Sequence, residues 1–299
     1  MPDSGRGGPM RSEKEIFDLI LEIGEKDERI RGIYMNGSRT NPNVPKDIFQ
    51  DYDVVYVVRE TESFMEDKNW IRQFGEILYM QLPDEFPDEG TDTSQCYGWL
   101  VQFADGVRID LHVETVEKNL ADGFDDCLTV ILLDKDNRFP ELPESNDSGY
   151  HVRKPDKTRY ACVCNEFWWC LNNVAKGMWR DEMPYVQDMV NFHVRKQLEK
   201  MLAWKVGILT GFSVSVGKSG KYMYRWLEKE EWETYLSTWF SSDPEEAWEA
   251  VFRMCDLFRQ TAEYVGRELG YEYNATEGAN SRSYLEHVHR LPKDAMEVM

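Results

Sequence analysis

The sequence has little of what membrane-spanning, disulfide-rich or nucleic-acid-binding proteins require. No window approaches the roughly 20 uninterrupted apolar residues of a spanning helix, so we expect no membrane partner. Six cysteines in 299 residues are too few for a disulfide framework and indicate reduced thiols in a cytoplasmic protein. With 55 Asp and Glu against 35 Lys and Arg, the formal charge of −20 leaves no broad basic surface for nucleic acid. The same acidity permits a cationic partner.

Length and composition predict two folded domains and two loose ends. A domain takes ~100–200 residues, so the chain has room for about two. Residues 1–9 are expected to be a disordered leader or a cloning remnant, and their origin stays open. Two prolines with Asn, Asp, Ser and Gly predict a linker over 139–149. We therefore expect domains over 10–140 and 150–273 and a loosely ordered tail over 274–299; the oligomeric state is unknown.

The first domain has the pattern of an α+β fold with a mixed, partly antiparallel sheet. Ser12 and Glu15 form a capping-box pattern, which predicts that a helix begins there. Gly106 in the sequence Ala-Asp-Gly indicates a hairpin turn. Strand-like runs lie at 30–35, 52–58, 77–81, 99–103 and 108–113, and helix-prone stretches lie at 63–74 and 116–122.

The second domain is expected to be a helical bundle. Helical periodicity covers 160–175, 185–208, 228–240 and 244–269. Eight of the ten tryptophans lie from Trp168 onward, so large aromatic side chains can build its core.

Two short motifs could carry chemistry. A predicted strand leads into Gly37-Ser38, where the backbone can approach a ligand and the amides and hydroxyl can bind phosphate oxygens. Asp51 and Asp53 begin the next strand, two residues and roughly 6.6 Å apart on one face. Carboxylate oxygens at that separation suit one magnesium ion or a close metal pair. Each motif alone is usually structural.

A third carboxylate makes the combination more specific. Along 108–113, apolar residues occupy one strand face, while Asp110 and His112 share the other. If this strand pairs beside 52–58, Asp110 joins Asp51 and Asp53 at one cation site. Such a site can align a nucleotide phosphate with an attacking hydroxyl.

These residues resemble the signature of the polymerase-β-like nucleotidyltransferase superfamily. More narrowly, the chain is similar to the aminoglycoside 6-adenylyltransferases, the streptomycin-modifying family. The stretches that carry the resemblance are MRSEKEI, KDERIR, NGSRTN, FQDYD, LLDKDNR, CNEFWW and VAKG, between Met10 and about Tyr273. The resemblance implies an N-terminal nucleotidyltransferase domain, a C-terminal helical substrate-binding domain and an active site in the cleft between them.

The resemblance also implies roles at the nucleotide. Asp51 and Asp53 would hold Mg²⁺, and Asp110 would complete the set as a ligand or as the base that removes the hydroxyl proton. Gly37 and Ser38 would contact phosphate, with Arg39 beside the nucleotide.

Two lysines and three acids complete the implied site. Lys218 and Lys221 match two family lysines that would reach the β- and γ-phosphates of ATP. Their Gly-Lys-Ser sequence is not a Walker loop, because position 212 is Phe and the stretch follows a helical run. Glu166 is a retained acid that could be the substrate-side base or contact an ammonium group of the drug. Glu182 and Asp188, on or near the next predicted helix, are further candidates for an acidic substrate surface.

Two departures leave the drug open. Ala161 and Cys162 stand where the family has paired aspartates, so streptomycin or another aminoglycoside could be the acceptor. Cys162, Cys164 and Cys170 lack zinc-site spacing and have no adjacent histidine pair, which indicates free thiols.

The resemblance therefore implies magnesium-dependent transfer of AMP from ATP to an aminoglycoside hydroxyl, the streptomycin 6-hydroxyl first, with release of pyrophosphate and resulting antibiotic resistance. The alternatives are a nucleotidyltransferase with another small acceptor and a non-catalytic nucleotide- or drug-binding module.

Overall fold

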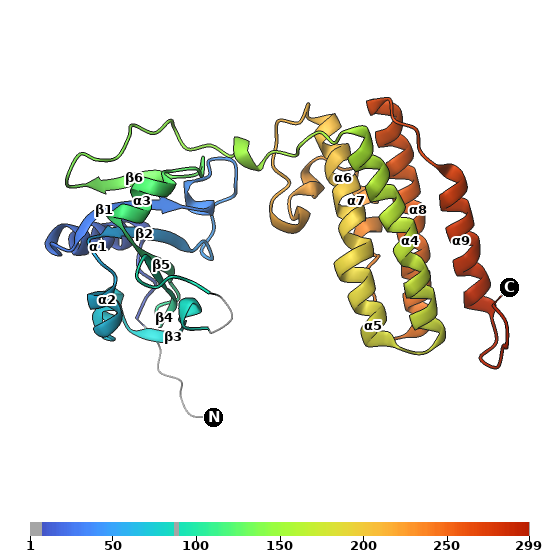
Figure 1. The fold of residues 1–299 in the computed structure, drawn as a ribbon, viewed down its shortest axis with the longest axis horizontal. Coiled ribbons are helices and arrows are strands. Elements are labelled where there is room, and N and C mark those ends of the chain that lie inside the picture. The colour runs from blue at the N-terminus through green and yellow to red at the C-terminus, as the bar shows by residue number, and fades with distance from the viewer. Residues whose placement is uncertain (1–7, 87–89, 299) are drawn as a thin grey trace. The chain divides into compact units, whose positions relative to one another are not determined.

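The computed structural model describes residues 8–86 and 90–298. The chain divides into two compact units, the first ending at Gly149 and the second beginning at Tyr150 (Figure 1). This division lies at the end of the predicted linker. Most of the expected leader, residues 1–7, lies outside the described residues.

The first unit contains a six-stranded mixed sheet with the strand order β3-β4-β5-β2-β1-β6. The strands are β1 (Ile30–Asn36), β2 (Tyr52–Val58), β3 (Ile77–Gln81), β4 (Cys96–Phe103), β5 (Arg108–Thr115) and β6 (Val130–Asp134). Strands β2 and β5 are parallel, and the other neighbouring pairs are antiparallel. The α+β prediction with a mixed sheet is confirmed. Edge strand β6 was not predicted, because its half-buried side chains show no alternation.

Within the described part of the first unit, three α-helices accompany the sheet. They are α1 (Glu13–Lys26), α2 (Glu62–Glu66) and α3 (Val116–Asp122). Helix α1 begins with the predicted capping box, since Ser12 accepts from the Glu15 amide and Glu15 accepts from the Ser12 amide. The single helix expected over 63–74 is wrong. It breaks after α2, where Asp67 accepts from the Asn69 amide, and resumes as a 3₁₀ turn at Trp70–Phe74.

The two faces of the sheet differ in chemistry. On β5, Ile109, Leu111 and Val113 are buried in the apolar core, which also takes side chains from α1 and from Trp70–Phe74. The alternate residues Asp110 and His112 are half-buried on the opposite face. This alternation follows from the two-residue period of a strand. It places the candidate metal ligands away from the core.

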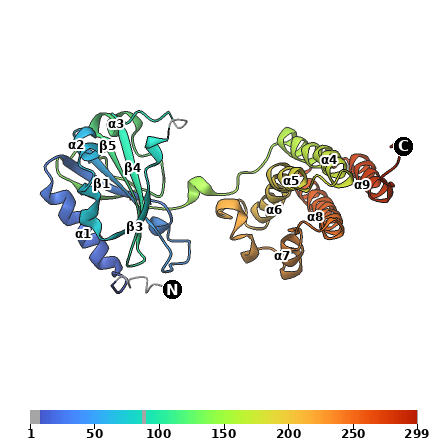
Figure 2. The ribbon, with the colours of Figure 1, turned by 90° about the horizontal axis from the view of Figure 1, so that it is seen from below.

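The second unit is helical (Figure 2). Its helices are α4 (Lys157–Trp179), α5 (Met183–Asp188), α6 (Arg195–Leu209), α7 (Lys229–Leu236), α8 (Pro244–Leu269) and α9 (Ala275–Arg290). A π-helical segment, Met189–Val194, joins α5 to α6. Phe167 of α4 stacks on Phe258 of α8 with ring centroids 3.7 Å apart. Large aromatic side chains thus contribute to the core, as the tryptophan distribution indicated.

The loosely ordered tail expected over 274–299 is corrected by the structure. Helix α9 occupies most of it and packs beside α4 (Figure 1). The Asn274 side chain caps the helix by accepting from the Glu277 amide, and Leu285 and Val288 are buried. Few apolar positions mark α9 in the sequence, so local periodicity did not predict this helix, which packs on α4.

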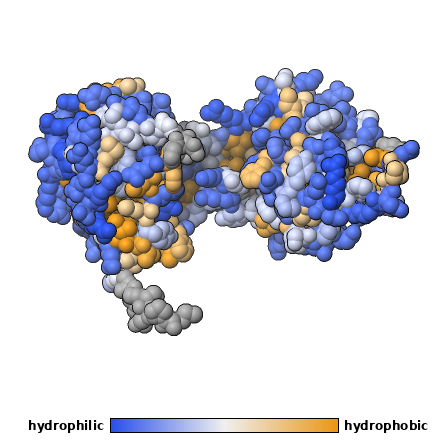
Figure 3. All heavy atoms as spheres, turned by 60° about the horizontal axis from the view of Figure 1, so that its bottom comes forward, coloured by the Kyte–Doolittle hydropathy of each residue, from blue (hydrophilic) through white to orange (hydrophobic). Residues whose placement is uncertain are grey.

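The face drawn in Figure 3 is mainly hydrophilic, with small apolar patches. Within 8–86 and 90–298, none of the helices has the length and apolar character needed to cross a bilayer.

Candidate active site

A glycine at the end of β1 makes room for one of the aspartates. Asn36 pairs with Asp53 across β1 and β2, and Gly37 follows with φ 81° and ψ −157°, a conformation that favours glycine. A Cβ atom at Gly37 would lie 1.9 Å from Asp53 Oδ2. Gly37 therefore lets the backbone approach the Asp53 carboxylate, a contact that the sequence did not predict, and the approach to a ligand stays a prediction.

The structure brings the three predicted carboxylates together. Asp53 and Asp110 are register partners on the parallel strands β2 and β5, and Asp51 directly precedes β2. Carboxylate oxygens of Asp51, Asp53 and Asp110 all lie within 4.8 Å of one another, and the three residues are half-buried. Strands β2 and β5 are paired, as the predicted convergence of the three carboxylates required. This all-oxygen donor set fits a hard divalent cation such as Mg²⁺.

The electrostatics of the cluster favour a bound cation. Burial first, and then the negative charges of Asp51 and Asp110, raise the pKa of Asp53 to about 7 against the opposing effects of Arg108 and Arg39. Burial and the two neighbouring carboxylates therefore both disfavour the ionised form of Asp53 when no cation is bound. A bound dication would favour the ionised form of Asp53.

Arg108 is a site residue that the sequence reasoning missed. Its Nε and Nη2 donate to the two oxygens of Asp110 at 2.8 and 2.6 Å, and Nε lies 3.9 Å from Asp51 Oδ2. The signal was present, because residues two apart on a strand share a face. Arg108 is thus the cation nearest to the candidate metal ligands.

Arg39 lies close to the aspartates through their backbone. Its Nη2 donates to the carbonyl of Gln50 at 2.6 Å and its Nε to the carbonyl of Asp51 at 3.2 Å. Its guanidinium carbon lies 3.7 Å from the ring centroid of Tyr52, and the side chain is 9% exposed. These contacts fix the backbone that leads into β2. The neighbouring Ser38 is half-buried in a 3₁₀ turn.

Lys218 and Lys221 belong to the second unit and are exposed. Helix α6 ends at Leu209, and both lysines lie in or next to the 3₁₀ turn Lys218–Gly220. A Walker loop joins a strand to a helix, so the exclusion of that motif is confirmed. The Lys221 ammonium lies 5.0 Å from the ring centroid of Tyr222.

The predicted substrate acids do not form one group. Glu166 is exposed on α4 and accepts from the Cys170 thiol at 3.4 Å, and His193 lies with them. Glu182 and Asp188, at the two ends of α5, are exposed outside this cluster. Burial and the neighbouring Glu166 raise the pKa of the Cys170 thiol to about 11.

The chain is similar to proteins of known activity over most of its length. It is 38% identical to an aminoglycoside 6-adenylyltransferase of Campylobacter jejuni, with 88% of this chain and 91% of the relative covered. It is 36% identical to that of Bacillus subtilis (strain 168), with 88% and 93% covered, and 33% identical to that of Staphylococcus aureus, with 88% and 94% covered.

A crystal structure of an aminoglycoside 6-adenyltransferase from Bacillus subtilis matches with 31% identity and a TM-score of 0.47, covering 94% of this chain and 100% of that one. The streptomycin adenylyltransferase family model matches residues 10–288, which include all the candidate site residues. The chain therefore belongs to the streptomycin adenylyltransferase family.

Proposed function

We propose that the chain transfers AMP from magnesium-bound ATP to a hydroxyl of an aminoglycoside, the 6-hydroxyl of streptomycin first, and releases pyrophosphate. Family membership makes it an aminoglycoside nucleotidyltransferase. The observation that supports the reaction most directly is the convergence of Asp51, Asp53 and Asp110 on neighbouring strands. The first unit would be a polymerase-β-like nucleotidyltransferase domain, and the second a helical substrate-binding domain. Modification of the drug in the cytoplasm, where ATP is available, would confer resistance.

The first unit supplies groups for the metal and the nucleotide. The carboxylates of Asp51, Asp53 and Asp110 would hold Mg²⁺, which when bound supplies a Lewis acid for the phosphate oxygens. Gly37 lets Asp53 lie against the backbone, and the Ser38 hydroxyl can donate to a phosphate oxygen. This part of the site positions the nucleotide and balances its charge.

Basic side chains offset the charge of ATP. Arg39 holds the backbone at Asp51 and would lie beside the nucleotide. The exposed ammonium groups of Lys218 and Lys221 would contact the β- and γ-phosphates. Local cations are needed, because a protein with a net charge of −20 repels a free nucleotide.

Glu166 is the better candidate for the base, and Asp110 for a ligand. Both oxygens of Asp110 accept from Arg108, so its carboxylate is already committed to a cationic partner. The Glu166 carboxylate is exposed on α4, and within the described residues its hydrogen-bond donor is the weak Cys170 thiol, so an acceptor hydroxyl or ammonium group can reach it. Glu182 and Asp188 would add negative charge for a cationic drug. A Glu166→Gln variant should lower the rate of transfer while ATP binding persists.

The direct test combines the protein with ATP, Mg²⁺ and streptomycin and measures pyrophosphate and a mass gain of one AMP on the drug. Asp53→Asn should lower the rate at least about 100-fold, because a metal supplies several kcal/mol of charge stabilisation. The matched control is Asp18→Asn, which changes an exposed acid paired with Lys14 on α1. If Asp53→Asn folds and keeps full activity, the metal assignment is wrong.

The exposed face of α4 favours a second possibility, in which the acceptor is a small molecule other than streptomycin. Ala161 and Cys162 are exposed there and replace the acids expected from the family pattern. A panel of aminoglycosides and lincosamides, scored by AMP mass gain, separates the two possibilities, and modification of streptomycin alone eliminates the second. Nucleotide binding without pyrophosphate release for every acceptor would instead indicate a non-catalytic binding module.

A further inference from the structure

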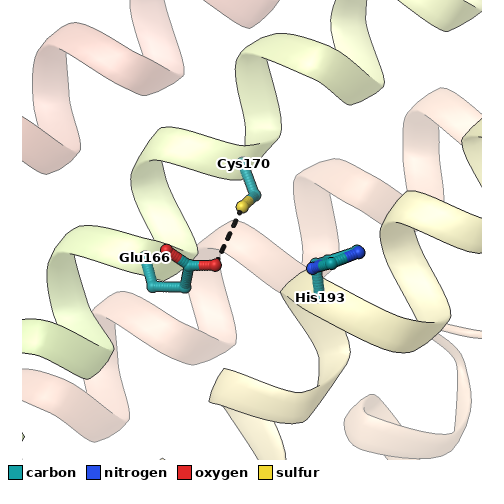
Figure 4. Close-up of side chains that lie close together, drawn as sticks. All are labelled: Glu166, Cys170 and His193. Atoms are coloured by element: carbon teal, nitrogen blue, oxygen red, sulfur yellow. Dashed lines mark hydrogen bonds between the residues drawn. The ribbon is translucent and has the colours of Figure 1, made fainter.

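Three side chains with different donor atoms meet on the second unit. Glu166 and Cys170 lie one turn apart on α4, and His193 reaches them from the π-helical segment (Figure 4). One ligand atom from each residue, an oxygen, a sulfur and a nitrogen, lies within 4.8 Å of the other two. The Cys170 thiol already contacts the Glu166 carboxylate at 3.4 Å. These atoms are close enough to share one ion.

The irregular helix fixes the position of the histidine. Within Met189–Val194, Val190 and Val194 are fully buried, whereas His193 between them is exposed. The segment packs against α4, so burial of the two valines orients this turn toward Glu166 and Cys170. π-Helical turns are rare and occur frequently at functional sites. The histidine is therefore held beside α4 by the core beneath it.

The donor set selects a class of metal. Thiolate and imidazole ligands suit zinc and similar transition metals, whereas Mg²⁺ prefers oxygen ligands alone. Three protein ligands leave a fourth position for water, as at an open zinc site. Cys170 is buried beneath, while Glu166 and His193 are exposed, so solvent can reach the ion. We propose that Glu166, Cys170 and His193 form a binding site for Zn²⁺ or a chemically similar divalent transition metal.

Occupancy of this site would regulate drug binding. A metal held by Glu166 removes the carboxylate that we assign to the acceptor and places positive charge where a cationic drug would bind. Zn²⁺ should therefore act as an inhibitor that raises the KM for the drug. This consequence rests on the proposed function, whereas metal binding itself does not.

Cobalt provides the test of binding, because a thiolate ligand to Co²⁺ produces a near-ultraviolet charge-transfer absorption that carboxylates cannot produce. The full chain is titrated with Co²⁺ under reducing conditions, with excess Mg²⁺ present to occupy the three-aspartate cluster. The wild-type protein should show the band at one ion per chain and lose it when Zn²⁺ is added.

Two variants assign the ligands. Cys170→Ala should abolish the band, and His193→Asn should weaken Co²⁺ and Zn²⁺ binding by at least about 10-fold. Cys162→Ala is the matched control, because it removes an exposed thiol from the same helix and should leave the band unchanged. Circular dichroism and thermal unfolding establish that each variant is folded.

The outcomes are separable from those of the proposed function, because the titration uses neither ATP nor drug. Absence of the band in the folded wild-type protein, or its persistence in Cys170→Ala, overturns the metal site. In the transfer assay, Zn²⁺ should raise the drug KM of the wild-type protein but not of Cys170→Ala. A band without that rise in KM overturns the regulatory consequence.

Discussion

Substitution of Gly37 by alanine isolates the geometry of the aspartate cluster. The methyl carbon would lie 1.9 Å from Asp53 Oδ2, whereas real contacts of this kind are essentially never closer than 3.0 Å. The Asp53 carboxylate must therefore move by roughly 1 Å or more, and a misplacement of that size costs about 100-fold in rate. Backbone strain adds about 1–3 kcal/mol of destabilisation, because φ 81° and ψ −157° disfavour an L-residue.

Gly123 provides the control for backbone strain. It has φ 70° and ψ −157°, nearly the conformation of Gly37, yet no heavy atom beyond its chain neighbours lies within 4 Å of its would-be Cβ. Gly123→Ala should lose similar stability in thermal unfolding but keep its rate of AMP transfer to the drug. Gly37→Ala should transfer AMP at least about 100-fold more slowly than Gly123→Ala. Equal rates for the two folded variants would refute the reasoning.

Three further predictions concern charge. The pKa of Asp53, about 7 against an ordinary 3.8, means that the folded metal-free protein binds this proton more tightly than the unfolded chain, so stability falls as pH rises through about 4 to 7. Between pH 5.5 and 8, the contribution of Asp53 to the free energy of unfolding should fall by about 2 kcal/mol. Denaturant unfolding in the presence of a chelator measures this change, and Asp53→Asn should remove it. Arg108→Ala should lower the Mg²⁺ concentration for half-maximal activity several-fold, because it removes the guanidinium that competes with Mg²⁺ for the Asp110 carboxylate. Arg108→Lys is the control, because it keeps the positive charge. Rising ionic strength should raise the KM of a cationic drug more than that of ATP, in steady-state kinetics, because salt screens the attraction of the acidic protein.

Each of these predictions has a contradicting result. An Asp53→Asn protein with the same pH profile of stability as the wild type would show that another group binds the proton, and Asp18→Asn should retain the wild-type profile. An unchanged Mg²⁺ requirement in Arg108→Ala would show that Arg108 does not compete with the ion. Equal salt effects on both KM values would mean that the acidity serves solubility alone.

Local patterns were sufficient for much of the fold. The capping box of α1 and the alternation of β5 involve residues at most five apart, so their structure follows from neighbouring side chains and the period of the element. Strand β6 and helix α9 lack such patterns, because the first is an edge strand paired with β1 and the second is stabilised by packing on α4. Their existence depends on partners distant in the chain.

The sequence by itself determined which residues could bind a metal and a nucleotide. Gly37, Asp51 and Asp53 form short motifs, and Asp110 lies on the polar face of an alternating strand. Only the tertiary structure decided that β2 lies parallel beside β5, which makes Asp53 and Asp110 neighbours.

Tertiary structure alone also placed His193 close to Glu166 and Cys170. The spacing of the cysteines in the sequence had indicated no zinc site there. Residue types and periodicity are local properties of the chain. The distance between two side chains depends on strand order and helix packing, which arise from burial of the whole apolar surface.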